Sequence, residues 1–214
     1  LNTKSGNAIT MNHGSLSMSG GAVEGILNVE QKNGTDVDLT GGTFEKIKMA
    51  DGVVTDVLGN GYGYRKDLSG VKGDWITDLN QLKSSEISNV QVDQKPFVSL
   101  TLTATSGGNK VSSGETVEFS YSGNKKYDLT VTAASGSSTA PSSFQWKFSY
   151  NGEAPRTLAN DQGEPYTAAT YSFSNNSPAG TYIYYAGATV KDSEDKNYTE
   201  WTEGFTITIN RLKD

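Results

Sequence analysis

The stretch Ser15–Ile26, with the sequence SLSMSGGAVEGI, aligns without a gap on Asp36–Ile47, with the sequence DVDLTGGTFEKI, at an offset of 21 residues. A period near 20 residues, apolar alternation in steps of two and no long helical pattern favour one coil of a parallel β-helix per copy. The glycine pairs 20–21 and 41–42 would then turn the corners where a positive φ is needed. The alternative is a pair of similar β-hairpins.

The apolar residues that coincide in the two copies define the expected core of this solenoid. Stacking would place Leu16, Met18, Val23 and Ile26 on Val37, Leu39, Phe44 and Ile47. The same register stacks Glu24 directly on Glu45, a mildly unfavourable pair. Residues 7–11 are predicted to be the remnant of an earlier coil, and residues 87–92 a closing strand.

The open end of a solenoid exposes apolar core and an unpaired strand edge, so a capping element is expected. Residues 51–59 supply a short helix, with Asp51 as its N-cap and Gly59 ending the turn. The side chains that would close the coil are Val54, Val57, Leu58, Tyr62, Tyr64, Trp75, Ile76, Leu79 and Leu82. The aromatic members of this set could instead stack on a sugar ring, but the capping role is favoured.

Three motifs in this first half carry a resemblance to a known class of protein: GGTF at 41–44, DVLGNGYGY at 56–64 and ISNVQV at 87–92. Together they resemble repeat regions of large, adhesin-like surface proteins from Gram-positive bacteria, often gut-dwelling or streptococcal. The resemblance covers roughly residues 15–92. It implies an extracellular location, on the cell wall or secreted, and it implies no reaction.

The pattern changes at residues 94–96, where Pro96 biases the preceding lysine toward extended backbone. We therefore expect a β-helix-type segment with its cap at 1–95 and a second domain at 96–214. Alternating apolar runs spaced by turn signals make the second domain typical of a β-sandwich. The expected strands are 98–105, 115–122, 127–133, 143–150, 169–174, 181–190 and 203–210.

Two aromatic residues of the second domain resemble landmarks of bacterial immunoglobulin-like repeats. Trp146 lies mid-strand, where such a domain packs its core indole, and Tyr182 lies at the entry to the F strand, the place of a tyrosine corner. The chain has no cysteine, so packing must join the sheets, with an isopeptide bond between Lys110 and Asn210 as an alternative. The predicted fold class is all-β: a short parallel β-helix with a capping helix, followed by an immunoglobulin-like β-sandwich.

Composition excludes several classes of function. The 214 residues carry a net charge of −6, which argues against a nucleic-acid or anionic-membrane partner. The absence of cysteine and the single histidine exclude thiol catalysis and zinc sites built on Cys or several His. No run of 18 apolar residues occurs, so no membrane insertion is expected. The chain opens on Leu1 without a signal peptide, which predicts a monomeric fragment of a longer chain.

Few side chains have the neighbours that catalysis or metal binding requires, and no cofactor is expected. His13 lacks a second imidazole, and Asp36 and Asp38 alternate outward from the coil, so all three are predicted to be solvated. Residues 192–197 are rich in carboxylates but lack the spacing of an EF-hand loop. A plain turn is therefore favoured there over a calcium site.

The best candidates for a ligand contact lie in two loops of the second domain, around 151–165 and 191–201. Loops on a rigid sheet commonly carry recognition, and an aromatic side chain among hydrogen-bonding groups suits a sugar or a protein edge. The predicted ligand-binding residues are Trp201, Tyr198 and Arg156, and the expected partner is a host glycan or host surface protein.

Three functions compete on this sequence. The first is a non-catalytic fragment of a bacterial cell-surface or secreted protein, acting as an adhesin stalk or spacer or as a module that binds host protein or glycan. The alternative is an accessory region of a secreted carbohydrate-active enzyme whose catalytic domain lies outside this chain. The least favoured is a polysaccharide lyase built on the β-helix itself, because two or three coils form too short a groove.

Overall fold

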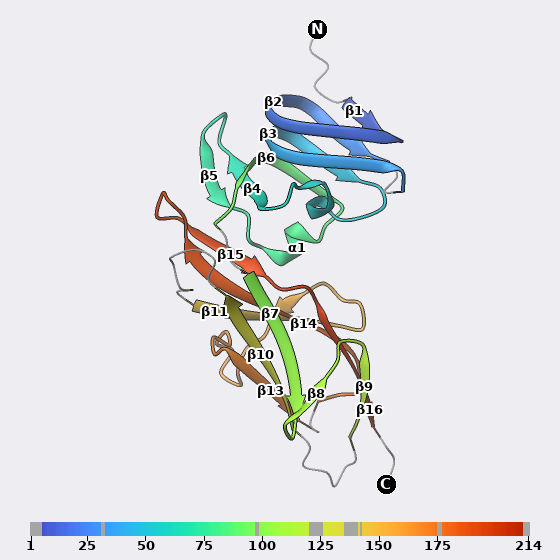
Figure 1. Ribbon diagram of the computed structural model, residues 1–214, viewed down its shortest axis with the longest axis vertical. Coiled ribbons are helices and arrows are strands. Elements are labelled where there is room, and N and C mark those ends of the chain that lie inside the picture. The colour runs from blue at the N-terminus through green and yellow to red at the C-terminus, as the bar shows by residue number, and fades with distance from the viewer. Residues whose placement is uncertain are drawn as a thin grey trace. The chain divides into compact units, whose positions relative to one another are not determined.

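The computed structural model describes residues 6–30, 33–96, 99–119, 126–134, 141, 143–174 and 177–211. These residues form an all-β protein with several sheets (Figure 1). The chain divides into two compact units, one holding Leu1–Pro96 with Lys191–Tyr198 and the other holding Phe97–Val190 with Thr199–Asp214. The predicted division into 1–95 and 96–214 therefore differs by residues 191–198, which belong to the first unit although they follow most of the second in sequence.

The first unit contains one six-stranded sheet with the order β1-β2-β3-β6-β4-β5. Three parallel strands come first, and the remaining pairings are antiparallel. Figure 1 shows β2 and β3 as long curved strands lying side by side. The strand bounds are β1 Asn7–Met11, β2 Gly14–Val29, β3 Thr35–Met49, β4 Tyr62–Asp67, β5 Lys72–Trp75 and β6 Glu86–Gln94.

The two sequence copies lie on β2 and β3 and pair at the predicted offset of 21 residues from Ser15↔Asp36 to Val23↔Phe44, interrupted by a local irregularity after Met18. Beyond Val23 the register slips, so that Leu27 and not Ile26 pairs with Ile47. Gly25, at φ 108°, lies at this slip, and such a bulge adds one residue to one strand. The predicted core position of Ile26 is therefore wrong, since Leu27 is fully buried and Ile26 is not.

The same slip removes the predicted stacking of Glu24 on Glu45. The Glu45 carboxylate instead accepts a hydrogen bond from the Gly25 backbone N–H at 2.8 Å. Glu24 is exposed to solvent. A carboxylate bound to a backbone donor satisfies a group that the bulge would otherwise leave unpaired. A favourable contact between Glu45 and the Gly25 backbone thus takes the place of the predicted repulsion between Glu24 and Glu45.

Alternation along β3 buries Val37 and Leu39 and exposes Asp36 and Asp38, as predicted. Buried side chains from β2, β3, η1, β4 and β6, together with Ile76, form one cluster in the first unit. Its fully buried members are Leu27, Leu39, Phe44, Ile47, Val54, Tyr64 and Val90. The apolar residues that alternate with polar ones in the sequence of β3 are therefore the residues that enter this core.

The predicted capping helix at 51–59 is shorter than expected. A single 3₁₀ turn, η1, covers Val54–Val57, and both of its terminal valines are buried. The N-cap is Val53 and not Asp51, because the Asp56 carboxylate accepts the Val53 backbone N–H at 3.0 Å. A short α-helix, α1, covers Leu79–Leu82, and the Asp78 side chain caps it. Polar side chains inside the segment thus decide where each turn begins.

The second unit contains two sheets, with the orders β13-β10-β7-β8 and β12-β11-β14-β16-β9, and β15 pairs with β14. The bounds are β7 Ser99–Ser106, β8 Asn109–Val111, β9 Glu115–Phe119, β10 Lys126–Ala134, β11 Ser143–Tyr150, β12 Arg156–Thr157, β13 Thr170–Ser174, β14 Gly180–Lys191, β15 Asn197–Trp201 and β16 Phe205–Arg211. All seven expected strands are present, although residues 98 and 120–122 of the expected ranges lie outside the described residues. The strands β8, β12 and β15 were not predicted, since they are short or polar.

Side chains from both sheets of the second unit form one buried cluster. Leu129 and Val131 enter it from the first sheet, and Trp146 and Ile207 enter it from the second. Trp146 is 1% exposed, and its indole N–H donates to the Ala168 carbonyl oxygen at 2.8 Å. The two sheets of the second unit therefore share one buried core, and the indole N–H within it has a hydrogen-bond partner.

Candidate functional site

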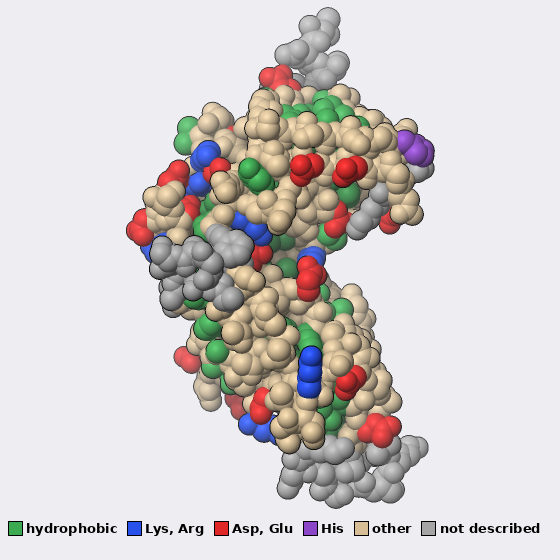
Figure 2. Space-filling model, in the orientation of Figure 1, with side chains coloured by type: hydrophobic (Ala, Val, Ile, Leu, Met, Phe, Trp, Pro, Cys, Tyr) green, Lys and Arg blue, Asp and Glu red, His purple; other side chains and the backbone are tan. Residues whose placement is uncertain are grey.

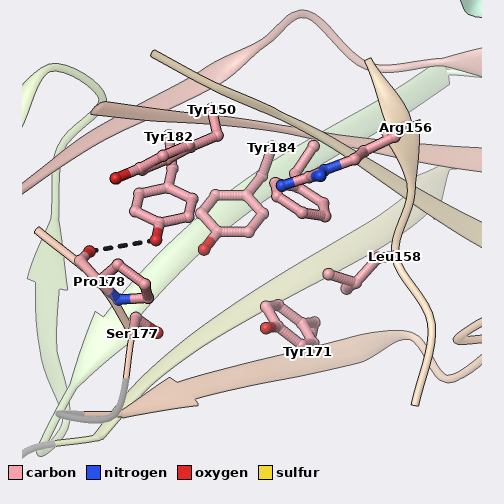
Figure 3. A pocket seen from close by; sticks show the side chains of 9 residues that line it. Tyr150, Arg156, Leu158, Tyr171, Ser177, Pro178, Tyr182 and Tyr184 are labelled. Atoms are coloured by element: carbon pink, nitrogen blue, oxygen red, sulfur yellow. Dashed lines mark hydrogen bonds between the residues drawn. The ribbon is translucent and has the colours of Figure 1, made fainter. Parts of the chain in front are cut away.

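A pocket of about 250 Å³ opens in the second unit beside β11 and β14 (Figure 3). Its lining is mostly aromatic, with one arginine and one short turn. The lining residues are Phe148, Tyr150, Arg156, Leu158, Tyr171, Ser177, Pro178, Tyr182 and Tyr184. A concave site rich in aromatic side chains with a few polar groups is the usual form of a small-ligand site.

Strand alternation explains why the aromatic side chains gather there. Phe148 and Tyr150 are two residues apart on β11, and Tyr182 and Tyr184 are two residues apart on β14, so each pair lies on one face. The strands are antiparallel, with Phe148 opposite Tyr184 and Tyr150 opposite Tyr182. The rings of Tyr182 and Tyr184 stack at 5.8 Å between centroids. The four rings form one continuous aromatic wall.

The phenol hydroxyls of this wall are not equivalent. Tyr182 donates to the Pro178 carbonyl oxygen at 3.1 Å, and Tyr150 donates to the Ala179 carbonyl oxygen at 2.8 Å. Tyr184 is only 2% exposed, and among the described residues its hydroxyl has no hydrogen-bond partner. Figure 3 shows this hydroxyl pointing into the space bounded by Ser177, Tyr171 and Tyr182.

Burial raises the pKa of Tyr184 far above its ordinary value, and the neighbouring Tyr171 and Tyr182 add to the effect. The pKa of Tyr171 is likewise raised, mainly by burial. Both phenols are therefore neutral at physiological pH, and each can donate a proton to a hydrogen-bond acceptor. The buried end of the pocket consequently offers donors.

One arginine lines the pocket and a second contacts a lining residue. The Arg156 guanidinium lies over the Phe148 ring, 4.6 Å from its centroid, and Arg211 donates to the Ser177 carbonyl oxygen at 2.7 Å. Both arginines act to lower the pKa of Tyr182, against the larger effect of burial, which raises it. No Asp or Glu belongs to the described lining. This local excess of positive charge contrasts with the net charge of −6 of the chain.

A second, wider hollow of about 490 Å³ lies elsewhere in the second unit. Its lining comes from 100–103, 110–113 and 202–205. The backbone beside it is already engaged, since the Thr206 N–H donates to the Ser113 hydroxyl and the Gly114 N–H donates to the Thr206 carbonyl. This hollow offers fewer aromatic side chains than the pocket at Arg156 and Tyr184.

The three residues predicted to bind a ligand do not come together. Arg156 lines the pocket, whereas the Trp201 ring packs on Gly187 and beneath Lys147, whose amine lies 5.2 Å from the ring centroid. Because Lys147 and Phe148 are adjacent on β11, Trp201 lies on the sheet face opposite the pocket. Tyr198 belongs to the first unit and is only 7% exposed.

Tyr198 and residues 192–197 take part in a polar cluster of the first unit. The Trp75 ring meets Tyr198 edge to face at 5.1 Å and lies beside the Arg65 guanidinium at 5.0 Å. The Asp192 carboxylate accepts from the Trp75 indole N–H at 2.7 Å and from the backbone N–H groups of Glu194 and Lys196. These partners account for the packing of Trp75, for which a sugar-stacking role had been the alternative.

The favoured prediction of a turn at 192–197 agrees with these contacts. Burial raises the pKa of Asp192, but the hydrogen bonds and the charge of Arg65 outweigh it and hold that pKa below its usual value. Among the described residues, no group of three or more His, Asp or Glu side chains is arranged to hold a metal ion. His13 is exposed, and Figure 2 shows the histidine at the molecular surface. Lys110 and Asn210, the alternative isopeptide partners, are exposed on different sheets.

The pocket tyrosines were not predicted as a group. The signal available was the pair of aromatic-x-aromatic spacings, Phe148 with Tyr150 and Tyr182 with Tyr184, which places each pair on one strand face. Within the described part of the chain, no helix is both long and apolar enough to traverse a bilayer. Comparison with protein-family models and with curated proteins found no match for this chain.

Proposed function

We propose that this chain is a non-catalytic, surface-displayed module of a bacterial protein, in which a β-helix-type stalk segment is followed by an immunoglobulin-like domain that binds a host glycan. The observation that carries the binding role is the aromatic pocket with Arg156 at its edge and the unpartnered Tyr184 hydroxyl within it. The extracellular, cell-wall setting rests on the motif resemblance of the first half.

The connection between β2 and β3 supports the β-helix-type stalk. The two strands are parallel, yet only residues 30–34 lie between them. Parallel strands usually need a crossover of about a dozen residues or more. A straight strand of 16 residues would extend about 53 Å, whereas five residues reach at most about 18 Å. Each strand must therefore curl back toward its own start, as a solenoid coil does.

The strand order of the second unit supports the immunoglobulin-like assignment. Taken in chain order, β7, β10 and β13 occupy the places of strands A, B and E in one sheet, and β11, β14 and β16 occupy those of C, F and G in the other. Trp146 lies on the strand at the C position. Tyr182 lies near the start of the strand at the F position, and its hydroxyl donates to the Pro178 carbonyl oxygen, as a tyrosine corner does.

The described lining of the pocket supports recognition more than catalysis. It offers ring faces, phenol donors and one guanidinium, and it contains no histidine or carboxylate to act as a general base. Aromatic faces pack against the C–H groups of a ligand, while hydroxyls and a guanidinium orient its polar groups. A single module of this size binds weakly, and repetition along a surface protein raises the avidity.

The test is a glycan array and a panel of immobilised host surface proteins probed with the fluorescent full chain, together with an assay for released oligosaccharide. We expect retention on a subset of glycans without product. Tyr171→Ala, which removes a pocket wall, should abolish retention, and Trp201→Ala, on the opposite sheet face, should preserve it. Release of product would contradict the non-catalytic role, and equal retention of both variants would contradict the pocket as the site.

A further inference from the structure

We propose that the pocket selects a sugar residue bearing a carboxylate, a uronic or sialic acid, with the carboxylate held by Arg156 and the Tyr184 hydroxyl. This inference rests on the proposed binding function and names the ligand class of the same site. Three independent features of the pocket carry it: its charge, its buried donor and its aromatic walls.

The charge of the pocket favours an anion. Arg156 forms no ion pair with any described residue, and its guanidinium is held in place by the Phe148 ring at 4.6 Å. Arg211 lies close enough to affect the pKa of Tyr182, and the described lining adds no negative charge. A guanidinium presents paired N–H donors in the geometry that a carboxylate accepts. The exposed Arg156 guanidinium, which has no ion-pair partner among the described residues, is thus available to bind an anionic ligand.

The buried donor favours an acceptor placed deep in the pocket. The Tyr184 side chain is 2% exposed, and its hydroxyl has no partner among the described residues and points into the cavity (Figure 3). A ligand that places an acceptor beside this hydroxyl can therefore accept its hydrogen bond. The raised pKa of this phenol keeps its proton available for donation.

The walls and the size of the pocket favour a pyranose ring. Tyr150 and Tyr182 have their hydroxyls committed to backbone carbonyls, so they present ring surface to a ligand. The volume of about 250 Å³ is slightly smaller than that of typical small-ligand sites, which begin at about 300 Å³, and this suits one sugar ring. The Ser177 side chain, which also lines the pocket, gives the remaining sugar hydroxyls a partner able to donate and to accept.

The experiment is an NMR titration of the full chain with methyl glucuronoside, with its methyl ester and with methyl glucoside. One sugar residue is expected to bind with a dissociation constant of about 1 mM. The ester and the glucoside should bind about tenfold more weakly, because both lack the charge-assisted contacts. Added salt should lower the affinity for the glucuronoside and leave the affinity for the glucoside unchanged. N-acetylneuraminic acid, run in parallel, distinguishes the two sources of a sugar carboxylate.

Two variants and a matched control complete the test. Arg156→Gln should remove the preference for methyl glucuronoside over methyl glucoside. Tyr184→Phe keeps the aromatic ring and should lower the affinity for the glucuronoside by a factor of about three to ten. Lys147→Gln removes a cation from the same strand on the opposite face, so it should bind the acid as the unmodified chain does. The amide spectrum of each variant verifies that it is folded.

Three results would overturn the assignment. They are equal affinity for the acid and the glucoside, retention of the preference in Arg156→Gln, and tighter binding of N-acetylphenylalanine, which would make the pocket a site for a peptide carboxyl terminus. Retention of the chain on neutral glycans alone would overturn this inference and leave the proposed function standing. Oligosaccharide cleavage would overturn the non-catalytic function without removing a carboxylate preference, because the preference is measured as binding and not as turnover.

Discussion

At the scale of single residues, Arg65 organises the polar cluster of the first unit. Its side chain is 3% exposed and lies 2.8 Å from the Glu194 carboxylate, 3.3 Å from Asp93 and 3.8 Å from Asp192. Its Nε–H also donates to the Gly73 carbonyl at 2.9 Å. A buried cation with several carboxylate partners is costly to break from one side, because the remaining charges lose their compensation.

Arg65→Met should therefore lower the free energy of unfolding of the first unit by about 3 kcal/mol at pH 7. The matched control is Lys72→Met, which removes a half-exposed partner of Asp93 and should cost less than about 1 kcal/mol. Urea unfolding followed by the indole N–H resonance of Trp75 measures both. Equal losses for the two variants would show that burial of Arg65 adds nothing.

The pH dependence of this deficit follows from the direction of the pKa shifts. For Asp93 and Asp192, burial raises the pKa, but hydrogen bonds and nearby cations outweigh it and leave both values lowered. A carboxylate whose pKa is lowered by folding stabilises the folded state at a pH above its unfolded pKa of about 3.9. This contribution is lost as the pH falls through the folded pKa. The Arg65→Met deficit should thus be full at pH 7 and shrink as the pH falls below the unfolded value of about 3.9 and through the lowered folded values. A deficit independent of pH would contradict the ion-pair explanation.

Trp146 is the residue on which the second core depends. Replacing it with alanine removes a buried indole and its hydrogen bond to Ala168, and should destabilise the second unit by about 3–5 kcal/mol. Trp201→Ala, with a half-buried ring on the outer sheet face, is the control and should cost less. Chemical unfolding followed by circular dichroism measures both variants. A loss below about 1 kcal/mol for Trp146→Ala would place the indole outside the core.

At the scale of elements, the glycine pairs of β2 and β3 occupy equivalent places but have different surroundings. A Cβ on Gly41 would clash with the Ser19 carbonyl oxygen, whereas a Cβ on Gly20 would meet nothing within 4 Å. Gly21 and Gly42 have positive φ values of 84° and 105°. The second copy therefore needs Gly41 because the first copy packs on it, and the first copy has no such neighbour.

Gly41→Ala should destabilise the first unit by about 1–3 kcal/mol or more, because backbone cannot move aside as a side chain can. Gly20→Ala, the same substitution one repeat earlier, should change stability by less than about 0.5 kcal/mol. Thermal unfolding of the two variants compares them directly. A similar loss in both would mean that the glycines serve the bend of each strand and not the approach of one strand to the next.

At the scale of the whole molecule, the two units have separate cores. Phe44→Asp places a charge in the first core and should unfold that unit, because a buried unpaired charge costs several kcal/mol. The indole N–H resonance of Trp75 should then lose its native position, while that of Trp146 should keep it. Asp36→Asn, an exposed change on the same strand, should leave both resonances in place. Loss of the native Trp146 signal in Phe44→Asp would show that the second unit does not fold alone.

Much of this architecture could be predicted from the spacing of apolar residues along the sequence. Alternation in steps of two identified the seven main strands of the second unit, and the 21-residue repeat identified the parallel pairing of β2 and β3. The outward direction of Asp36 and Asp38 followed from the same alternation, whereas the burial of Trp146 was expected from the resemblance to immunoglobulin-like repeats. These features are encoded locally, because side-chain direction in a strand depends only on position along it.

Contacts between distant residues decided the rest. The register slip at Gly25, the first-unit membership of residues 191–198 and the separation of Arg156 from Trp201 all depend on which strands become neighbours. The pocket arises only because β11 and β14 pair with Phe148 opposite Tyr184. Sequence determined that each of these side chains lies on one face of its strand. Only the tertiary structure determined that the two faces meet beside Arg156, because pairing between strands about 35 residues apart has no local signal.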